Sequence, residues 1–296
     1  MIYGALEAGG TKMVCATGME NGTITDQVSI PTRQPDETMA DIIDYFKDKN
    51  INALGIASFG PIDLDMSSKT YGHITTTPKQ GWAYYDLVGT IKKALNVPIG
   101  FDTDVNGSLL GEVTYGDSKG LSDVVYITVG TGIGGGVMSG GKLLHGMLHP
   151  ELGHMLMRTH VSDTYTGKCP YHKNCLEGMA SGPAIEERWG AKGKDLAENK
   201  AVWDLEAYYL GQAIANLILT LSPKRIILGG GVMHQTQLFA LIRKEVKDQL
   251  NGYIQTPLLN DMDSYIVPAS LNDDQGIMGC IKLAIDAKEE QVKPAP

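Results

Sequence analysis

The feature that most constrains this chain is a pattern that occurs twice, in which two short apolar runs are joined by a glycine-rich turn. The first copy consists of residues 2–8, the turn Gly9-Gly10-Thr11-Lys12 and residues 13–17, and the second consists of residues 124–129, the turn at 130–136 and Val137-Met138. Short apolar runs that end at glycine are typical of buried strands, so each copy predicts a strand, a tight turn and a second strand. Each copy also opens a series of alternating strands and helices. Such a repeat predicts two α/β units of the same plan.

The apolar spacing elsewhere predicts the remaining elements. Helices are expected where apolar residues recur every three or four positions, at about residues 36–46, 87–95, 107–115, 210–221, 235–250 and 274–290. Strands are expected at the short apolar runs 53–59, 97–101, 225–228 and 265–269. The polar, glycine-containing stretch 116–120 predicts a boundary between an N-terminal domain at 1–117 and a C-terminal domain at 118–274, with the helix at about 275–290 packing back on the first. The tail at 291–296 is expected to be disordered.

Composition excludes two classes of partner. The formal net charge is −9 at pH 7, with 34 Asp and Glu against 25 Lys and Arg, whereas a nucleic-acid surface needs clustered basic side chains. No apolar run approaches the ~20 residues of a membrane span. The start of the chain shows neither a basic leader nor a signal-peptide core. With 43% hydrophobic and 20% charged residues, the sequence predicts a globular cytoplasmic protein that binds neither nucleic acid nor membrane.

Three potential metal ligands lie within seven residues of each other: Cys169, His172 and Cys175, in the spacing C-x2-H-x2-C. They belong to a long insertion in the second unit. Thiolate and imidazole ligands at short spacing favour tetrahedral Zn²⁺, and a fourth protein ligand would close the site and make it structural. His154 is the expected fourth ligand, and His160 is an alternative that the sequence leaves open. A disulfide between the two cysteines is the competing interpretation, but a thiolate metal site fits a reducing compartment.

Carboxylates near this cluster and after one strand predict a site for a polar ligand. Glu151 and Glu177 flank the ligand cluster, so a bound zinc ion would hold both acids in place. Asp104 lies where a predicted strand gives way to a helix, which is where ligands bind in open α/β sheets. An aspartate there can also cap the helix, although only one of Asp102 and Asp104 can do so.

Three glycine-rich turns offer the groups that bind a nucleotide. Gly10-Thr11-Lys12 offers backbone N–H groups, a hydroxyl and a cation, as phosphate binding requires, although most Gly-Gly turns are only turns. The stretch from Gly130 to Gly135 matches G-x-G-x-x-G, but a strand is expected after it where a dinucleotide-binding fold needs a helix. We therefore predict a phosphate-binding hairpin there. Gly229-Gly230-Gly231-Val232 follows a predicted strand, and it either lets a purine approach the backbone or is simply a tight turn. The sequence contains no P-loop motif.

Together these motifs resemble the ROK family of sugar kinases and sugar-responsive repressors, and within it the bacterial zinc-containing fructokinases. The resemblance covers nearly the whole chain and rests on Glu7-Ala8-Gly9-Gly10-Thr11-Lys12, Asp104-Val105-Asn106, residues 130–136, Glu151-Leu152-Gly153-His154, the C-x2-H-x2-C cluster and Leu176-Glu177-Gly178. It implies an actin/hexokinase-like (ribonuclease H-like) fold of duplicated α/β domains around a central cleft, and a homodimer. Many family members have Asp at the position of Glu7, Asn at that of Thr103 and a third cysteine at that of His172. These departures resemble the fructokinase branch.

The resemblance also implies a reaction and the residues that carry it out. The reaction is the ATP-dependent phosphorylation of fructose to fructose 6-phosphate, with Mg²⁺ on the nucleotide, a structural Zn²⁺ ion, and Asp104 as the general base on the sugar hydroxyl. The residues implied to bind the sugar are Asn106, Glu151, His154 and Glu177. The residues implied to bind ATP are Gly10, Thr11, Lys12, Thr131, Gly132, Pro183, Gly229, Gly230, Gly231 and Val232. The residues implied to bind zinc are His154, Cys169, His172 and Cys175. A kinase for glucose or mannose is the alternative, and a sugar-responsive regulator is disfavoured because the chain is acidic and starts directly on the first strand.

Overall fold

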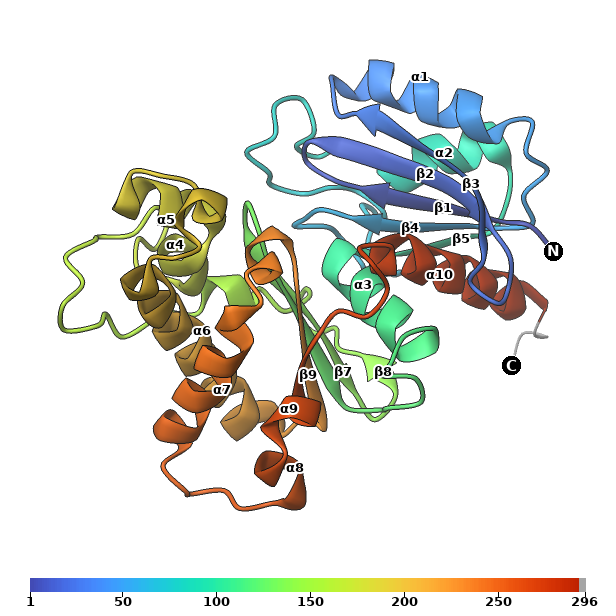
Figure 1. The fold of residues 1–296 in the computed structure, drawn as a ribbon. Coiled ribbons are helices and arrows are strands. Elements are labelled where there is room, and N and C mark those ends of the chain that lie inside the picture. The colour runs from blue at the N-terminus through green and yellow to red at the C-terminus, as the bar shows by residue number, and fades with distance from the viewer. Residues whose placement is uncertain (293–296) are drawn as a thin grey trace. The chain divides into compact units, whose positions relative to one another are not determined.

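The computed structural model describes residues 1–292, which form two compact units (Figure 1). Unit 1 contains Met1–Gly120 and Leu143–His149 and resumes at Ser270; unit 2 contains Leu121–Lys142 and Pro150–Ala269. Unit 1 is therefore assembled from three separate segments of the chain. The domain boundaries expected at 117 and 274 stay a prediction.

Unit 1 is built on a five-stranded sheet in the order β3-β2-β1-β4-β5. Its strands are β1 (Tyr3–Ala8), β2 (Lys12–Gly18), β3 (Ile24–Pro31), β4 (Leu54–Ser58) and β5 (Ile99–Thr103). β2 is antiparallel to both β1 and β3, whereas β1, β4 and β5 are parallel to one another. The carboxyl ends of these three parallel strands therefore share one edge of the sheet, the edge at which α/β proteins usually bind ligands.

Unit 2 repeats this plan. Its strands are β6 (Val124–Val129), β7 (Ile133–Ser139), β8 (Lys142–Leu143), β9 (Arg225–Gly229) and β10 (Ile266–Pro268). They lie in the order β10-β9-β6-β7-β8, with β6 antiparallel to β7 and β9 parallel to both β6 and β10. Read in reverse, the order is β8-β7-β6-β9-β10, which corresponds strand by strand to β3-β2-β1-β4-β5 in unit 1. The predicted duplication of an α/β unit is confirmed.

Both glycine-rich turns connect antiparallel strands, as the sequence predicts. Gly9 N–H donates to the carbonyl of Lys12 at 3.0 Å, and Gly130 N–H donates to the carbonyl of Gly132 at 2.9 Å. The second turn is shorter than expected, because β7 already begins at Ile133 and includes the glycines at 134–136. These glycines belong to the strand because it packs closely on its neighbours. A Cβ atom on Gly135, for example, would lie 2.5 Å from a methyl carbon of Leu152.

Helices cover both faces of the sheet of unit 1 (Figure 1). The helices are α1 (Pro35–Phe46) and α2 (Leu87–Leu95) on one face and α3 (Asp104–Thr114) and α10 (Gln275–Val292) on the other. Successive side chains of β1 point to opposite faces, so Leu6 packs in the core of the first face and Ala5 in the core of the second. α3 and α10 approach so closely that a Cβ atom on Gly279 would lie 1.8 Å from the carbonyl oxygen of Gly107. This contact fixes the position of α3, which carries Asp104.

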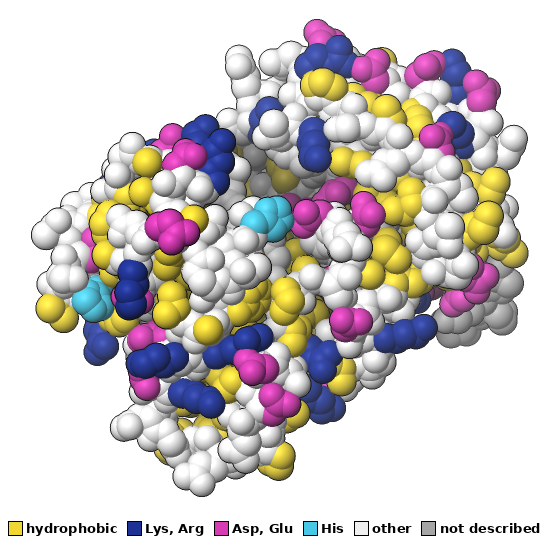
Figure 2. Space-filling model, viewed as in Figure 1, with side chains coloured by type: hydrophobic (Ala, Val, Ile, Leu, Met, Phe, Trp, Pro, Cys, Tyr) yellow, Lys and Arg dark blue, Asp and Glu magenta, His cyan; other side chains and the backbone are white. Residues whose placement is uncertain are grey.

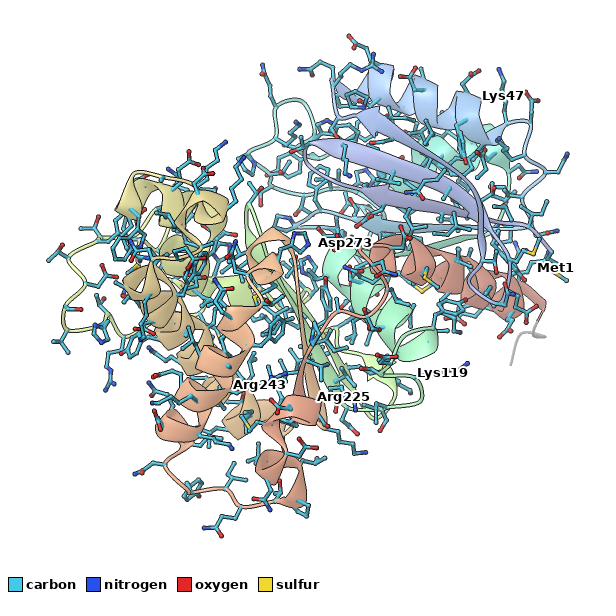
Figure 3. All side chains as sticks on the ribbon, viewed as in Figure 1. Met1, Lys47, Lys119, Arg225, Arg243 and Asp273 are labelled. Atoms are coloured by element: carbon cyan, nitrogen blue, oxygen red, sulfur yellow. The ribbon has the colours of Figure 1, made fainter. Side chains whose placement is uncertain are left out.

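The helices of unit 2 pack on one apolar core with its sheet. The helices are α4 (Leu176–Ala180), α5 (Gly182–Trp189), α6 (Lys200–Leu221), α7 (Gln237–Leu250), α8 (Pro257–Asn260) and α9 (Met262–Tyr265), with the 3₁₀ helices η1 (Leu152–His154), η2 (Gly193–Leu196) and η3 (Gly231–His234). Ile214 of α6 and Ile242 of α7 are fully buried in this core. Arg243, labelled in Figure 3, reaches from α7 to the sheet, and its Nε donates to the carbonyl of Ile266 at 3.0 Å.

Two differences from the predicted elements have simple causes. β3 was not predicted because it is an edge strand whose side chains are mostly exposed, so its sequence contains no continuous apolar run. The C-terminal helix includes Gln291 and Val292, which were expected to be disordered. The good helix formers from Ala287 onward, including Lys, Glu and Gln, favour this extension. The rest of the predicted disordered tail, 293–296, lies outside the described residues.

Acidic and basic side chains are interspersed on the face drawn in Figure 2. Among the helices of residues 1–292, none has the length and apolar character needed to cross a bilayer.

Candidate active site and metal centre

Asp104 lies at the carboxyl end of β5, where it is the first residue of α3. The N-cap of this helix is Thr103, whose hydroxyl accepts the N–H of Asn106 at 3.1 Å. Neither Asp102 nor Asp104 is therefore the cap, which the sequence had left as an alternative role for one of them. The threonine hydroxyl satisfies the free N–H group, and both aspartates are left for other contacts. Asp104 is half-buried, and its Oδ1 accepts the N–H of Val105 at 2.9 Å.

The surroundings of Asp104 raise its pKa. Burial raises the pKa from 3.8 to about 6, against the lowering effect of the backbone N–H of Val105. The pKa of Glu7 on β1 is raised to about 7, first by burial and then by the negative charge of Asp104. A carboxyl group with a pKa near 6 is mostly ionised at pH 7 and is still basic enough to share a hydroxyl proton. The position and the pKa of Asp104 both suit a general base.

A hydrogen-bond network lies directly before Asp104. Oδ1 of Asp102 accepts the N–H of Thr103 at 2.8 Å and Nδ2 of Asn106 at 2.7 Å. Its Oδ2 lies 2.9 Å from Nε2 of His145, and this hydrogen bond raises the pKa of His145. Reasoning from the sequence selected Asn106 but missed Asp102 and His145 as partners. Their separation of 43 residues hides the pair, because no local spacing links them.

The turn Gly10-Thr11-Lys12 belongs to unit 1, like Asp104, and connects β1 to β2. Thr32 holds the turn from one side: its hydroxyl donates to the carbonyl of Gly9 at 2.7 Å and its N–H to that of Thr11 at 3.0 Å. The turn itself is exposed, and a Cβ atom on Gly10 would meet no atom within 4 Å. An anchored but open turn with a lysine at its end is able to bind a phosphate group.

Glu177 holds the turn of the second hairpin in unit 2. Its Oε2 accepts the N–H of Ile133 at 3.0 Å, and a Cβ atom on Gly132 would lie only 2.8 Å from that oxygen. Glu177 follows Cys175 in α4. The carboxylate expected on the sugar therefore contacts the hairpin, and it connects the hairpin to the segment that carries the cysteines.

A pocket of about 470 Å³ in unit 2 collects most of the residues expected around the nucleotide in this unit. Its lining includes Gly130, Thr131, Gly182, Pro183, Gly231 and Val232. The N–H of Gly182 donates to the carbonyl of Gly130 at 2.8 Å, which joins the two turns. Ile185 and Trp203 give the pocket apolar walls, and Lys192 and Lys194 supply positive charge. The other two glycines of residues 229–231, also expected to bind the nucleotide, are not among the lining residues. Gly230 adopts a φ of 90° directly before the lining residue Gly231, and Gly229 is buried against Tyr126.

The cysteine segment of unit 2 is shaped by a tight turn and a helix end. The N–H of Lys173 donates to the carbonyl of Cys169 at 3.0 Å, and Lys173 adopts the left-handed conformation that closes the turn. This turn presents Cys169 and His172. Cys175 is the N-cap of α4, where its Sγ accepts the N–H of Gly178 at 3.4 Å.

His154 reaches the same place from a different part of unit 2. It is the last residue of η1, which lies directly on β7. The packing is so close that a Cβ atom on Gly153 would lie 1.7 Å from the carbonyl oxygen of Ile133. The four ligand atoms of His154, Cys169, His172 and Cys175 consequently lie within 4.8 Å of one another.

The distances within this group fit a shared zinc ion. Nδ1 of His154 lies 3.5 Å from Sγ of Cys175 and 3.9 Å from Sγ of Cys169, which is 3.8 Å from Nδ1 of His172. Zn–S bonds of ~2.3 Å and Zn–N bonds of ~2.0–2.1 Å at a tetrahedral angle place sulfur and nitrogen ligands ~3.6 Å apart. Both cysteines are free and buried, so no disulfide joins them. His160, the alternative ligand, is not in the group, and its Nδ1 lies 2.8 Å from Oγ of Ser162.

The chemistry of the four ligand side chains also supports a zinc site. Burial raises the pKa of the Cys175 thiol to about 11, so without a cation this sulfur stays protonated at neutral pH. A bound Zn²⁺ ion reverses this effect and deprotonates the thiol. Two buried thiols and two imidazoles in this arrangement have an evident use as metal ligands, and the group is consistent with a closed, structural zinc site.

The predicted site residues fall into two sets. Asp104, Asn106 and the turn Gly10-Thr11-Lys12 belong to unit 1. Unit 2 holds the metal ligands, Glu177, the pocket residues, and the exposed Glu151 just before η1. The sugar and nucleotide roles of individual residues stay predictions.

The fold is shared with solved structures of known class. The chain matches a ROK family glucokinase from Streptomyces griseus, determined in complex with glucose and AMPPNP, with a TM-score of 0.78 and 23% identity over 97% of this chain and 100% of that one. The two α/β units differ in length but have the same strand order. They thus have the actin/hexokinase-like topology expected from the sequence.

The chain belongs to the ROK family, whose model matches residues 3–287. It is 51% identical to a putative fructokinase of Bacillus subtilis (strain 168), over 98% of this chain and 97% of that protein. It is 47% identical to a fructokinase of Pediococcus pentosaceus, over 96% of this chain and 98% of that protein.

Proposed function

We propose that this protein is a fructokinase that transfers the γ-phosphoryl group of ATP to fructose and forms fructose 6-phosphate and ADP. Identities of 40–51% to several fructokinases, each over nearly the full length, support the substrate. The observation that carries the chemistry is Asp104, a carboxylate at the ligand-binding edge of a sheet with its pKa raised to about 6. Glucose or mannose is the alternative acceptor.

In the proposed mechanism Asp104 acts on the acceptor hydroxyl. Its carboxylate accepts the hydroxyl proton while the sugar oxygen forms a bond to the γ-phosphorus. The bond between the γ-phosphorus and the bridging oxygen of ADP breaks, and that oxygen keeps the electron pair. Such a step needs little covalent help, because positioning and charge stabilisation dominate phosphoryl transfer. A base of this kind contributes ~10²–10⁴ in rate.

The nucleotide is proposed to bind through the glycine-rich turns. The apolar and glycine-backbone walls of the pocket in unit 2 suit a purine and its ribose, with Pro183, Gly231 and Val232 in contact with the adenosine. The hairpin N–H groups near Thr131 and Gly132 suit phosphate oxygens. Lys12, beside Gly10 and Thr11 on unit 1, adds a positive charge for the phosphates. Mg²⁺ bound to ATP would neutralise the remaining phosphate charge.

Zinc is proposed to have a structural role, held by His154, Cys169, His172 and Cys175. It would supply a cross-link between η1 and α4, and thereby fix Glu151 and Glu177, which are proposed with Asn106 to bind the sugar. A thiolate metal site functions in a reducing compartment, which supports the cytoplasm as the location. A homodimer is the proposed assembly.

A coupled assay of ADP release tests this function. Purified protein is given Mg²⁺-ATP and, at sub-saturating concentrations, fructose, mannose, glucose or N-acetylated hexoses. We expect the highest kcat/KM with fructose. A higher value with another hexose would keep the kinase and overturn the substrate, and no ADP release with any of these sugars would overturn the kinase itself.

A further inference from the structure

The segment Leu143–His149, called here the histidine loop, is attached to the ligand-binding edge of the sheet in unit 1. His145 contacts Asp102 at the end of β5, with 2.9 Å between Nε2 and Oδ2. His149 Nε2 accepts the N–H of Ile62 at 3.3 Å, just beyond the end of the neighbouring strand β4. The loop therefore borders the carboxyl ends of two adjacent parallel strands, where Asp104 also lies.

Asp102 fixes the ring of His145 at one nitrogen. Its carboxylate is almost fully buried and is itself oriented by the N–H of Thr103 and the amide of Asn106. Because a carboxylate only accepts hydrogen bonds, Nε2 of His145 carries the proton that it donates. Nδ1 is then an acceptor in the neutral ring and a donor in the charged one.

The other ring nitrogen is open. No hydrogen bond of the described residues 1–292 uses Nδ1 of His145, and 41% of the side chain is exposed. In metal sites a carboxylate that accepts from one ring nitrogen fixes the tautomer and orientation of the imidazole, and Asp102 holds the ring of His145 in the same way with the other nitrogen open.

The place of the pair next to Asp104 fits the proposed acceptor sugar. Asp102 and Asp104 are separated by one residue, which corresponds to ~7 Å between Cα atoms in extended backbone. A hexose with one hydroxyl at Asp104 extends over such a distance. Each of its other hydroxyl groups can either donate or accept a hydrogen bond, so Nδ1 of His145 is a suitable partner in the neutral and in the charged ring.

We propose that His145 is a sugar-binding residue whose Nδ1 hydrogen-bonds a hydroxyl group of the acceptor sugar, and that Asp102 is the positioning residue that holds its ring. This inference rests on the proposed kinase function. It assigns to the histidine loop a part in recognising the sugar.

Two substitutions separate sugar binding from attachment of the loop. In His145→Gln the side-chain amide is able to replace Nε2 and donate to Asp102, but nothing replaces Nδ1. In His145→Ala both contacts are lost. His160→Gln is the matched control, because that histidine lies in unit 2 and its ring nitrogen Nδ1 lies 2.8 Å from Oγ of Ser162 in its own loop. The dissociation constant of fructose is measured by titration calorimetry without ATP, and kcat and both KM values are measured in the ADP-release assay.

We expect His145→Gln to raise the dissociation constant and the KM of fructose ~3- to 20-fold, as for one lost hydrogen bond. Its kcat should change less than ~3-fold and its KM for ATP should not change. His145→Ala should weaken fructose binding at least as much. In a series of monodeoxyfructoses, the analogue that lacks the contacted hydroxyl should bind wild type and His145→Gln equally well.

Two results would overturn the proposal. One is a His145→Gln protein with wild-type affinity for fructose. The other is a parallel loss of kcat, sugar affinity and ATP affinity in both variants, which would mean that the pair only supports the fold. Failure of the proposed function would look different, because wild-type protein would then release no ADP with any hexose. The affinity for fructose measured without ATP would still report the contribution of His145.

Discussion

Replacing Asp104 with Asn should make the protein slower and more stable. Asn keeps the shape and is able to accept the N–H of Val105, but it cannot take a proton from the sugar, so kcat should fall ~10²–10⁴-fold with little change in fructose affinity. The free energy of unfolding should increase, because Asn is neutral and, unlike the Asp104 carboxylate, carries no charge that burial destabilises. A rise in the pKa of Asp104 from 3.8 to about 6 corresponds to a destabilisation of about 3 kcal/mol once the folded carboxyl is ionised.

The sign follows from proton binding. The folded protein binds this proton more tightly than the unfolded chain, so the contribution of Asp104 to stability decreases as the pH rises from 3.8 through 6. The advantage of Asp104→Asn should therefore be largest near pH 7, at up to about 3 kcal/mol, and should shrink to about 0.5 kcal/mol at pH 4.

Urea unfolding of both proteins at pH 4, 5.5 and 7 measures this difference, and the ADP-release assay measures turnover. Asp36→Asn is the matched control, since Asp36 is an exposed aspartate in the first turn of α1 and should affect neither quantity strongly. Near-normal turnover of Asp104→Asn would refute the role as base. A variant that is less stable than wild type at pH 7 would refute the account of the raised pKa.

Four further predictions concern the rest of the chain. The kcat of wild type should decrease as the pH falls through about 6, where Asp104 becomes protonated; a pH–rate profile flat from pH 7.5 to 5 would contradict this. Cys169→Ser should lose the bound zinc and unfold at a lower temperature, whereas Cys15→Ser, a buried cysteine outside the group, should keep it, as metal analysis and thermal unfolding will show. Glu177→Ala should release the second hairpin and raise the KM of both ATP and fructose severalfold, and an unchanged KM of ATP would contradict the part of Glu177 in holding the hairpin. Gly279→Ala should destabilise by several kcal/mol, because its Cβ would lie 1.8 Å from a carbonyl oxygen of α3, and unchanged urea unfolding would contradict the packing.

The duplicated fold was predictable because its signal is local. Each unit begins with a hairpin whose apolar runs and glycine turn are contiguous in sequence, and the two copies can be compared directly. Edge strand β3 was missed for the opposite reason: its mostly exposed side chains carry no apolar pattern, and only pairing with β2 defines it. The sequence predicts a turn at the glycines 134–136 because glycine usually breaks strands, but they pair with β6 within β7, and a Cβ atom on Gly135 would clash with Leu152.

The candidate site was predictable where ligands lie close in sequence. Cys169, His172 and Cys175 have a spacing that indicates a metal, and the structure adds His154 in preference to His160. Contacts between distant segments were not predictable. The bond from Asp102 to His145 spans 43 residues, and that from Glu177 to Ile133 spans 44, so neither leaves a local pattern.

The central claim is that this chain phosphorylates fructose at its 6-hydroxyl. Nuclear magnetic resonance of the reaction products measures this directly, with ¹³C-labelled fructose and ATP and with phosphorus and carbon spectra recorded as ADP accumulates. The account predicts one sugar product, fructose 6-phosphate, formed in equal amount to ADP by wild type and at a rate reduced ~10²–10⁴-fold by Asp104→Asn. Phosphate on another hydroxyl, or ADP formed together with free phosphate and unchanged fructose, would contradict it.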